Sequence, residues 1–256
     1  MVEFAWAGSA LVGLPLVGLL IEQWGWQAPF FALGGLGLLS LVALGILIPT
    51  DRHQHRGTEG RPAFRQAWRR LSGERAALGA LGFGLLISAA NDNLFVVYGL
   101  WLESSFGLSV AVLGATTTVI GVAELLGEVL TASIADRLGL KRAIVAGLIL
   151  SALSYILLPL VGRTLSSALV GLFITFLTFE FTIVTALSLS SEILPAARAT
   201  MMSSSVAAVS IGRVMGALIG GPVWLAGGML ATGCVSAAVS GLALVLLVWG
   251  LRGWRD

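Results

Sequence analysis

Charged side chains are scarce in this chain. Asp, Glu, Lys and Arg make up 11% of its 256 residues, against about 25% in a soluble domain. Apolar residues make up 57% of the chain, and the mean hydropathy is +0.96. This composition excludes a soluble globular protein and indicates a chain that crosses a membrane several times.

Cysteine and catalytic motifs are also nearly absent. The one cysteine, Cys234, excludes an internal disulfide and a metal site built from thiolates. His53-x-His55 has no fixed carboxylate or cysteine partner for a metal ion. Gly34-Gly35-Leu36-Gly37 lies inside an apolar helix with no strand before it, unlike a nucleotide loop. We therefore expect no enzyme, no cofactor and no bound metal.

Long apolar runs dominate what is present. A membrane-spanning helix needs about 20 apolar residues. Eight stretches reach this length, at approximately 4–22, 29–49, 76–101, 109–134, 143–161, 166–190, 200–224 and 229–250. Turn signals such as Trp24-Gly25-Trp26 and Gly227-Gly228 separate them. We predict an all-α, polytopic transmembrane bundle of eight helices.

The basic residues define an orientation. Of the 15 Lys and Arg residues, 13 fall on one side of the eight-helix zigzag, and Arg163 alone lies in a loop on the other side. Lys and Arg gather on the cytoplasmic side of membrane proteins. We therefore expect an integral protein of the plasma membrane with both termini cytoplasmic. The lipid bilayer is then its main partner, and we expect no nucleic acid partner.

One connection, residues 50–75, is long and charged, and it divides the chain into two helices followed by six. Within it, Phe64, Trp68 and Leu71 recur at helical spacing beside Arg65 and Arg69, as in an interfacial amphipathic helix. The alternative is a solvated basic linker whose periodicity is accidental. Either reading makes 50–75 a cytoplasmic linker.

The first two helices resemble the last two. In both pairs a helix rich in small residues precedes a tight turn and an uncharged helix. The small residues and prolines concerned are Gly8, Gly13, Pro15 and Gly18 in the first pair and Gly212, Gly216, Gly220, Gly221 and Pro222 in the last. If the last pair closes a six-helix unit, the first pair should close one too. We therefore expect that four preceding helices are missing.

Two loops carry a family resemblance. Residues 136–142, Asp-Arg-Leu-Gly-Leu-Lys-Arg, resemble the D-R-x-G-x-[KR]-[RK] loop of the major facilitator superfamily of secondary transporters. Residues 192–198, with Glu192, Pro195 and Arg198, are similar to the loop between the tenth and eleventh helices of that family. Residues 8–30 look like the fifth and sixth helices of an efflux-type member.

The resemblance implies an organisation and a function. Residues 1–49 would be the last two helices of the N-terminal half-bundle, and residues 76–256 the six-helix C-terminal half-bundle. The complete protein would move a small organic solute by alternating access, with or without coupling to protons. The alternative is a membrane scaffold or partner subunit that does not transport.

Five charged residues lie inside expected spans, where each costs roughly 2.5–3.5 kcal/mol on the insertion scale. They are Asp92, Glu124, Glu128, Glu180 and Arg213. They must face a cavity or one another. Glu180 and Arg213 lie about 15 and 20 Å from the cytoplasmic ends of their helices, at about 1.5 Å per residue. We expect them to meet near the midplane, as a substrate or proton site or as a static bridge.

Two further groups of polar residues accompany this expected pair. Asn91, Asp92 and Asn93 follow one another, so they cannot all face one direction. At least one should line the pathway, while another should bond a neighbouring helix. Glu124 and Glu128 share a helical face. We expect Glu124, the deeper one, in the substrate or proton pathway, and Glu128 at the cytoplasmic gate.

The resemblance implies that the loop residues form this gate. They are Asp136, Arg137, Gly139, Lys141 and Arg142, with Glu192 and Arg198 in the later loop. Anchoring of the basic residues on the inner membrane side is the alternative. The spacing of Gly212, Gly216 and Gly220 favours close helix packing, and Gly220-Gly221-Pro222 could instead form a hinge.

Overall fold

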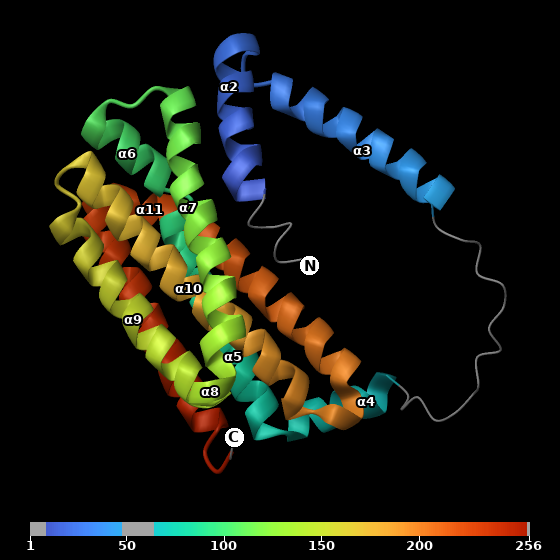
Figure 1. The fold of residues 1–256 in the computed structure, drawn as a ribbon. Coiled ribbons are helices and arrows are strands. Elements are labelled where there is room, and N and C mark those ends of the chain that lie inside the picture. The colour runs from blue at the N-terminus through green and yellow to red at the C-terminus, as the bar shows by residue number, and fades with distance from the viewer. Residues whose placement is uncertain (1–8, 48–63, 255–256) are drawn as a thin grey trace.

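The computed structural model describes residues 9–47 and 64–254, which form helices and no strand (Figure 1). Six stretches are long and apolar enough to cross a membrane. The last of them, Pro195–Gly250, is broken at Gly227 and Gly228 into two. With the shorter helix Leu11–Trp24, these give the eight expected spans in the expected order. The prediction of an all-α, polytopic bundle is confirmed.

The helices end where the sequence supplies caps and glycines. Their order is η1 Ser9–Gly13, α2 Leu14–Trp24, α3 Ala28–Leu47, α4 Phe64–Gly73, α5 Arg75–Phe95, α6 Tyr98–Phe106, α7 Val110–Leu130, η2 Thr131–Ala135, α8 Asp136–Leu138, α9 Leu140–Val161, α10 Leu165–Ile193, η3 Pro195–Ala197 and α11 Arg198–Gly250. Thr164 and Ser167 form a reciprocal capping box at the start of α10. Gly228, at φ +60°, turns the chain inside α11, a conformation that suits glycine.

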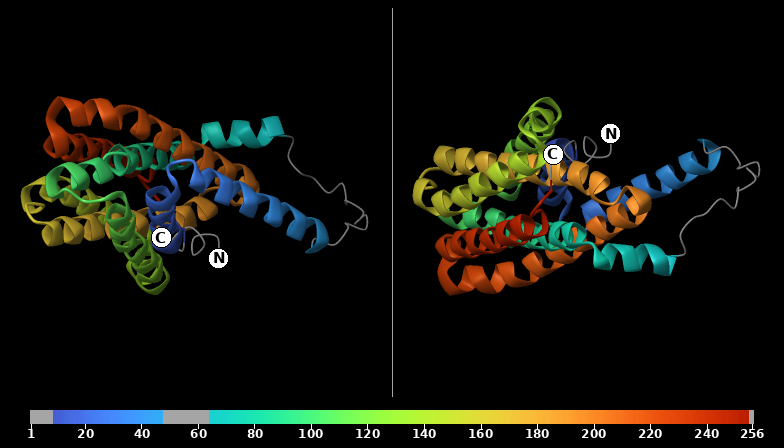
Figure 2. Two further views of the ribbon diagram at one scale, coloured as in Figure 1. Left: turned by 90° about the horizontal axis from the view of Figure 1, so that it is seen from above. Right: turned by 90° about the horizontal axis from the view of Figure 1, so that it is seen from below.

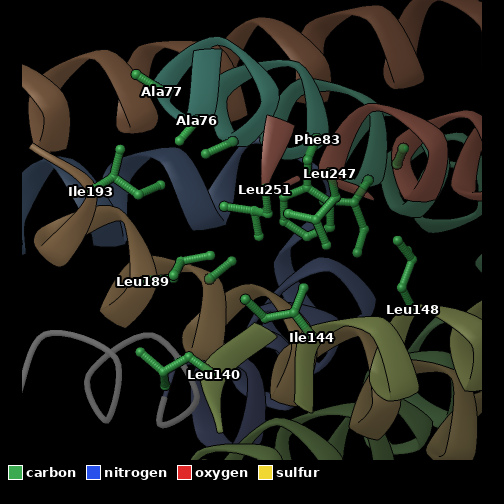
Figure 3. Close-up of a cluster of buried hydrophobic side chains, with 14 of the residues drawn as sticks. Ala76, Ala77, Phe83, Leu140, Ile144, Leu148, Leu189, Ile193, Leu247 and Leu251 are labelled. Carbon is green, nitrogen blue, oxygen red and sulfur yellow. The ribbon is translucent and has the colours of Figure 1, made fainter. Parts of the chain in front are cut away.

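Helices α5 to α11 form the body of the molecule, around two clusters of buried apolar side chains. One cluster lies toward the end that carries Arg75 and Lys141, and it joins side chains from α5, α9, α10 and α11 (Figure 3). The second cluster includes Leu94, Tyr155 and Phe176. These two clusters fix the positions of the helices that carry the charged residues.

Helix α11 packs against α5 through glycines. A methyl group built on Gly212 would lie 2.8 Å from the carbonyl carbon of Leu85, and one built on Gly216 would lie 2.9 Å from the backbone nitrogen of Asn93. Gly220 likewise lies against Asn93. Because these glycines carry no side chain, the two backbones approach closely. Gly221 and Pro222 lie in the same helix, and nothing lies within 4 Å of a methyl group built on Gly221.

The first two membrane-spanning helices, α2 and α3, differ in how they contact the body. Helix α2 packs on α7, where a methyl group built on Gly18 would lie 3.1 Å from the Cα of Gly114. Gly13 and Pro15 lie at the junction of η1 and α2, with Pro15 in the first turn of α2, where proline is tolerated. Helix α3 points away from the body in every view (Figures 1 and 2). All of its described side chains except Pro29 are exposed or nearly so.

The basic linker contains the expected helix. It is α4, in which Leu71 is buried in the first apolar cluster and Trp68 is half exposed. Trp68 lines an apolar groove of about 430 Å³ with Leu81, Leu85 and residues of α11. The sequence motifs at Gly8, His53 and His55 lie outside the described residues.

A charged face inside the helical body

An ion pair joins α5 to the first half of α11. The Nε of Arg213 lies 3.5 Å from Oδ2 of Asp92, and the side chains are 36% and 14% exposed. Arg213 lies about 22 Å along the helix from Arg198, at about 1.5 Å per residue, so the pair sits deep in the span. A charge at this depth in a membrane is costly, and an oppositely charged partner offsets part of that cost.

The expected partner of Arg213 was Glu180, and the ion pair found for Arg213 is with Asp92. Glu180 lies on α10 and is 4% exposed. Its side chain packs against α7, where a methyl group on Gly127 would lie 2.8 Å from the Cβ of Glu180. Arg213 therefore pairs with a carboxylate on α5, which is the helix that the glycines of α11 contact.

The three consecutive polar residues of α5 reach three different helical segments. Asp92 faces Arg213 in the first half of α11. Asn93 donates to the carbonyl of Thr232 at 3.2 Å and to the hydroxyl of Ser236 at 3.0 Å, both in the second half of α11. The Tyr155 hydroxyl of α9 donates to Oδ1 of Asn91 at 3.4 Å. Asn91 and Asn93 hold α5 in place, and Asp92 faces the partly exposed Arg213.

A second charged group lies between α7 and α10. Glu124 and Glu128 are each 6% exposed, and both lie on α7, the helix against which Glu180 packs. Thr131, one turn beyond Gly127, donates to the carbonyls of Gly127 at 3.0 Å and Phe181 at 3.3 Å. Three carboxyl groups are therefore buried on facing helices.

Two tyrosines belong to this region, and the sequence analysis missed them. The chain contains two tyrosines in all. Tyr155 contacts Asn91. Tyr98 interacts electrostatically with Glu124 and packs with Phe95 and Phe176 at ring separations of 5.5 and 6.4 Å. A buried phenol needs a hydrogen-bond partner, and this requirement alone could have singled out Tyr155 in the middle of an apolar span.

The loop motifs lie together at the basic end of the body. Gly139 has φ +82° and turns the chain between α8 and α9. Asp136, Arg137 and Arg142 are exposed, and Lys141 donates to the carbonyl of Leu251 at 2.9 Å. Glu192 and Arg198 are exposed on either side of η3. The second motif therefore lies at the end of α10, and the first lies at the start of α9.

The sequence profile of the Major Facilitator Superfamily matches residues 1–97 and 81–255. The chain belongs to the Major Facilitator Superfamily. The family resemblance predicted from the two loops is therefore confirmed. Members of this superfamily are transporters, and this member is an integral membrane protein. The spans 29–49, 143–161 and 229–250 contain no Asp, Glu, Lys or Arg.

Three curated relatives in the superfamily illustrate the match. An uncharacterized MFS-type transporter, YceJ of Bacillus subtilis, is 29% identical over 84% of this chain and 54% of its own length. The inner membrane transport protein YdhP of Escherichia coli is 28% identical over 94% of this chain and 60% of its own length. The class C tetracycline resistance protein of Escherichia coli is 30% identical over 61% of this chain and 40% of its own length. The chain thus spans about half the length of these relatives.

Proposed function

We propose that this chain is a large part of a transporter that carries a small organic solute across the plasma membrane by alternating access. The observation that carries the proposal is the pair of Asp92 and Arg213, deep in the span and partly exposed. Charged residues at such depth are characteristic of substrate and ion pathways. Family membership and the resistance-protein relative support the same function.

The proposed organisation follows the sequence prediction. Residues 1–49 are the last two helices of an N-terminal half-bundle, residues 50–75 are a cytoplasmic linker, and residues 76–256 are the C-terminal half. The separation of α3 from the body supports this division, because α3 then contacts helices supplied by the rest of its own half. Alternating access moves one half against the other around a central site.

The buried carboxyl groups support coupling to protons. Asp92, Glu124 and Glu180 lie on three helices of the body, and each can take up a proton as the solute site changes its exposure. In this proposal Arg213 completes the pathway, and Asn91 and Asn93 hold α5 against its neighbours. Glu128 and the loop residues 136–142, Glu192 and Arg198 form the cytoplasmic gate.

A second function is favoured by a specific observation. Helix α3 exposes nearly its whole surface. A membrane scaffold or partner subunit would keep the packing of α5 to α11 and present α3 to another protein. Such a protein would bind its partner and would not move a solute.

Proteoliposomes distinguish these two functions. Uptake of a panel of organic solutes, tetracycline included, is measured with an imposed proton gradient. Two products are compared: the chain alone, and the product that includes all coding sequence in frame upstream of Met1. We expect saturable, gradient-dependent uptake by the longer product and none by the chain alone. A stop codon immediately upstream, with no uptake by the chain, would favour the scaffold.

A further inference from the structure

A groove at the basic end of the body combines loop residues of the proposed gate with an apolar wall. It measures about 880 Å³ and lies between the turn at Gly139 and the end of α11. Its polar wall consists of Asp136, Arg137, Lys141 and Arg142, and its apolar wall of Val145, Ala146, Ile149 and Trp254. A groove with one charged wall and one apolar wall suits an amphiphilic ligand.

The charged wall favours an anion. It contains three cationic side chains and one carboxylate. Lys141 is fixed by its hydrogen bond to the carbonyl of Leu251, while Arg137 and Arg142 are exposed. Gly139 caps α9 without a side chain, so the N–H groups in the first turn of this 22-residue helix receive no side-chain acceptor from the cap. A guanidinium pair beside a helix N-terminus is well suited to a phosphate.

The apolar wall extends from the charged wall toward the membrane centre. Ala146 and Ile149 are exposed on the surface of α9, and Ile149 lies about 12 Å along the helix from Lys141 at about 1.5 Å per residue. Trp254 lies beside the basic residues, at the level where tryptophan meets lipid headgroups. A free phosphate ion would leave this wall uncovered, whereas a lipid would cover it with an acyl chain.

We propose that this groove binds an anionic phospholipid of the leaflet at the basic end. The headgroup phosphate contacts Arg137 and Arg142, the glycerol lies beside Trp254, and one acyl chain lies along Ala146 and Ile149. Basic pockets on the cytoplasmic side of membrane proteins bind anionic headgroups in this way. The site is distinct from the charged face at Asp92 and Arg213, and it does not depend on whether the chain transports.

Native mass spectrometry of the full chain in a mild detergent tests the proposal. Dioleoylphosphatidylglycerol and dioleoylphosphatidylcholine are titrated separately, because they share acyl chains and differ in headgroup charge. We expect one phosphatidylglycerol molecule to bind more tightly than phosphatidylcholine. The double variant Arg137→Gln, Arg142→Gln should bind phosphatidylglycerol about 30-fold more weakly. These residues are exposed, so the fold should survive, and gel filtration checks this.

The matched control is Arg69→Gln, Arg70→Gln, which removes two exposed arginines from the neighbouring helix α4. It should bind phosphatidylglycerol as the unaltered chain does. An equal loss in the two double variants would show diffuse attraction to basic charge and would overturn the site. Equal binding of the two lipids, or displacement of phosphatidylglycerol by millimolar inorganic phosphate, would also contradict it.

Discussion

Consecutive side chains on a helix point about 100° apart, and residues 91–93 use this geometry to tie α5 to three neighbouring segments. The two amides serve packing, since both reach partners that are themselves buried. The carboxylate between them reaches a cation that is one third exposed. One short stretch therefore combines two packing contacts with one ion pair.

The two amides should differ in their contribution to stability. Asn93 donates two hydrogen bonds to α11, at 3.2 and 3.0 Å, while the bond between Asn91 and α9 is longer, at 3.4 Å. Asn93→Ala should therefore cost about 1–2 kcal/mol, and Asn91→Ala should cost less. Thermal unfolding in detergent measures both. A larger loss for Asn91→Ala would contradict the assignment.

The ion pair predicts coupling between its two members. Asp92→Asn leaves Arg213 without its carboxylate, and Arg213→Gln leaves the carboxylate without its cation. A double-mutant cycle on unfolding in detergent should give a coupling energy of about 1 kcal/mol or more. The control pairs Asp92→Asn with Arg198→Gln, on the same helix as Arg213 but at its exposed end. That cycle should be additive, and additivity in both cycles would mean that Asp92 and Arg213 do not interact.

At the scale of elements, the crossing of α5 and α11 decides which residues pair. Glycines at 212, 216 and 220 bring the backbones together, and Arg213 follows the first of them. This close approach places the side chain of Arg213 next to Asp92 on α5. Sequence spacing predicts that these glycines share a face but not which helix lies against that face. For this reason the sequence indicated Arg213 as a member of an ion pair but did not indicate Asp92 as its partner.

The crossing can be tested by adding one methyl group. Gly212→Ala and Gly216→Ala should each destabilise the protein by about 1–3 kcal/mol, because the added carbon meets the backbone of α5. Gly221→Ala, in the same helix but with open space around it, should be neutral or slightly stabilising. Thermal unfolding of the three variants compares them. Equal effects at all three positions would show that α5 does not lie against this face.

Other parts of the fold were readable from the sequence because their signals are local. Apolar runs gave the spans, and the two loop motifs gave the family. The helix at Phe64–Gly73 followed from its periodicity. The tyrosine contacts could not be read in this way, since Tyr155 and Asn91 are 64 residues apart and meet only in the assembled bundle. Proximity between distant helices depends on the whole bundle.

At the scale of the whole molecule, the charge distribution predicts an orientation. Single cysteines are placed at Glu192, at the basic end, and at Ser166, at the opposite end, in a Cys234→Ser background. Both positions are exposed, and Ser166 avoids the capping hydroxyl of Thr164. We expect an impermeant thiol reagent outside intact cells to label Ser166→Cys and not Glu192→Cys. The reverse pattern would invert the topology.

The central claim is that the pair of Asp92 and Arg213 lies on a water-filled pathway inside the membrane. Leu153 on α9 offers a matched comparison, because it is 49% exposed and lies at a similar depth, about 20 Å from the start of its helix. On this claim, Leu153 faces lipid and Arg213 faces the pathway.

The rates at which Arg213→Cys and Leu153→Cys react with a charged, impermeant thiol reagent test this claim most directly. Both variants are made in the Cys234→Ser background and compared in membranes. Charged reagents need water and a thiolate, so Arg213→Cys should react at least about tenfold faster than Leu153→Cys. Equal, slow reaction at the two positions would place Arg213 away from water and would contradict a transport pathway at this pair.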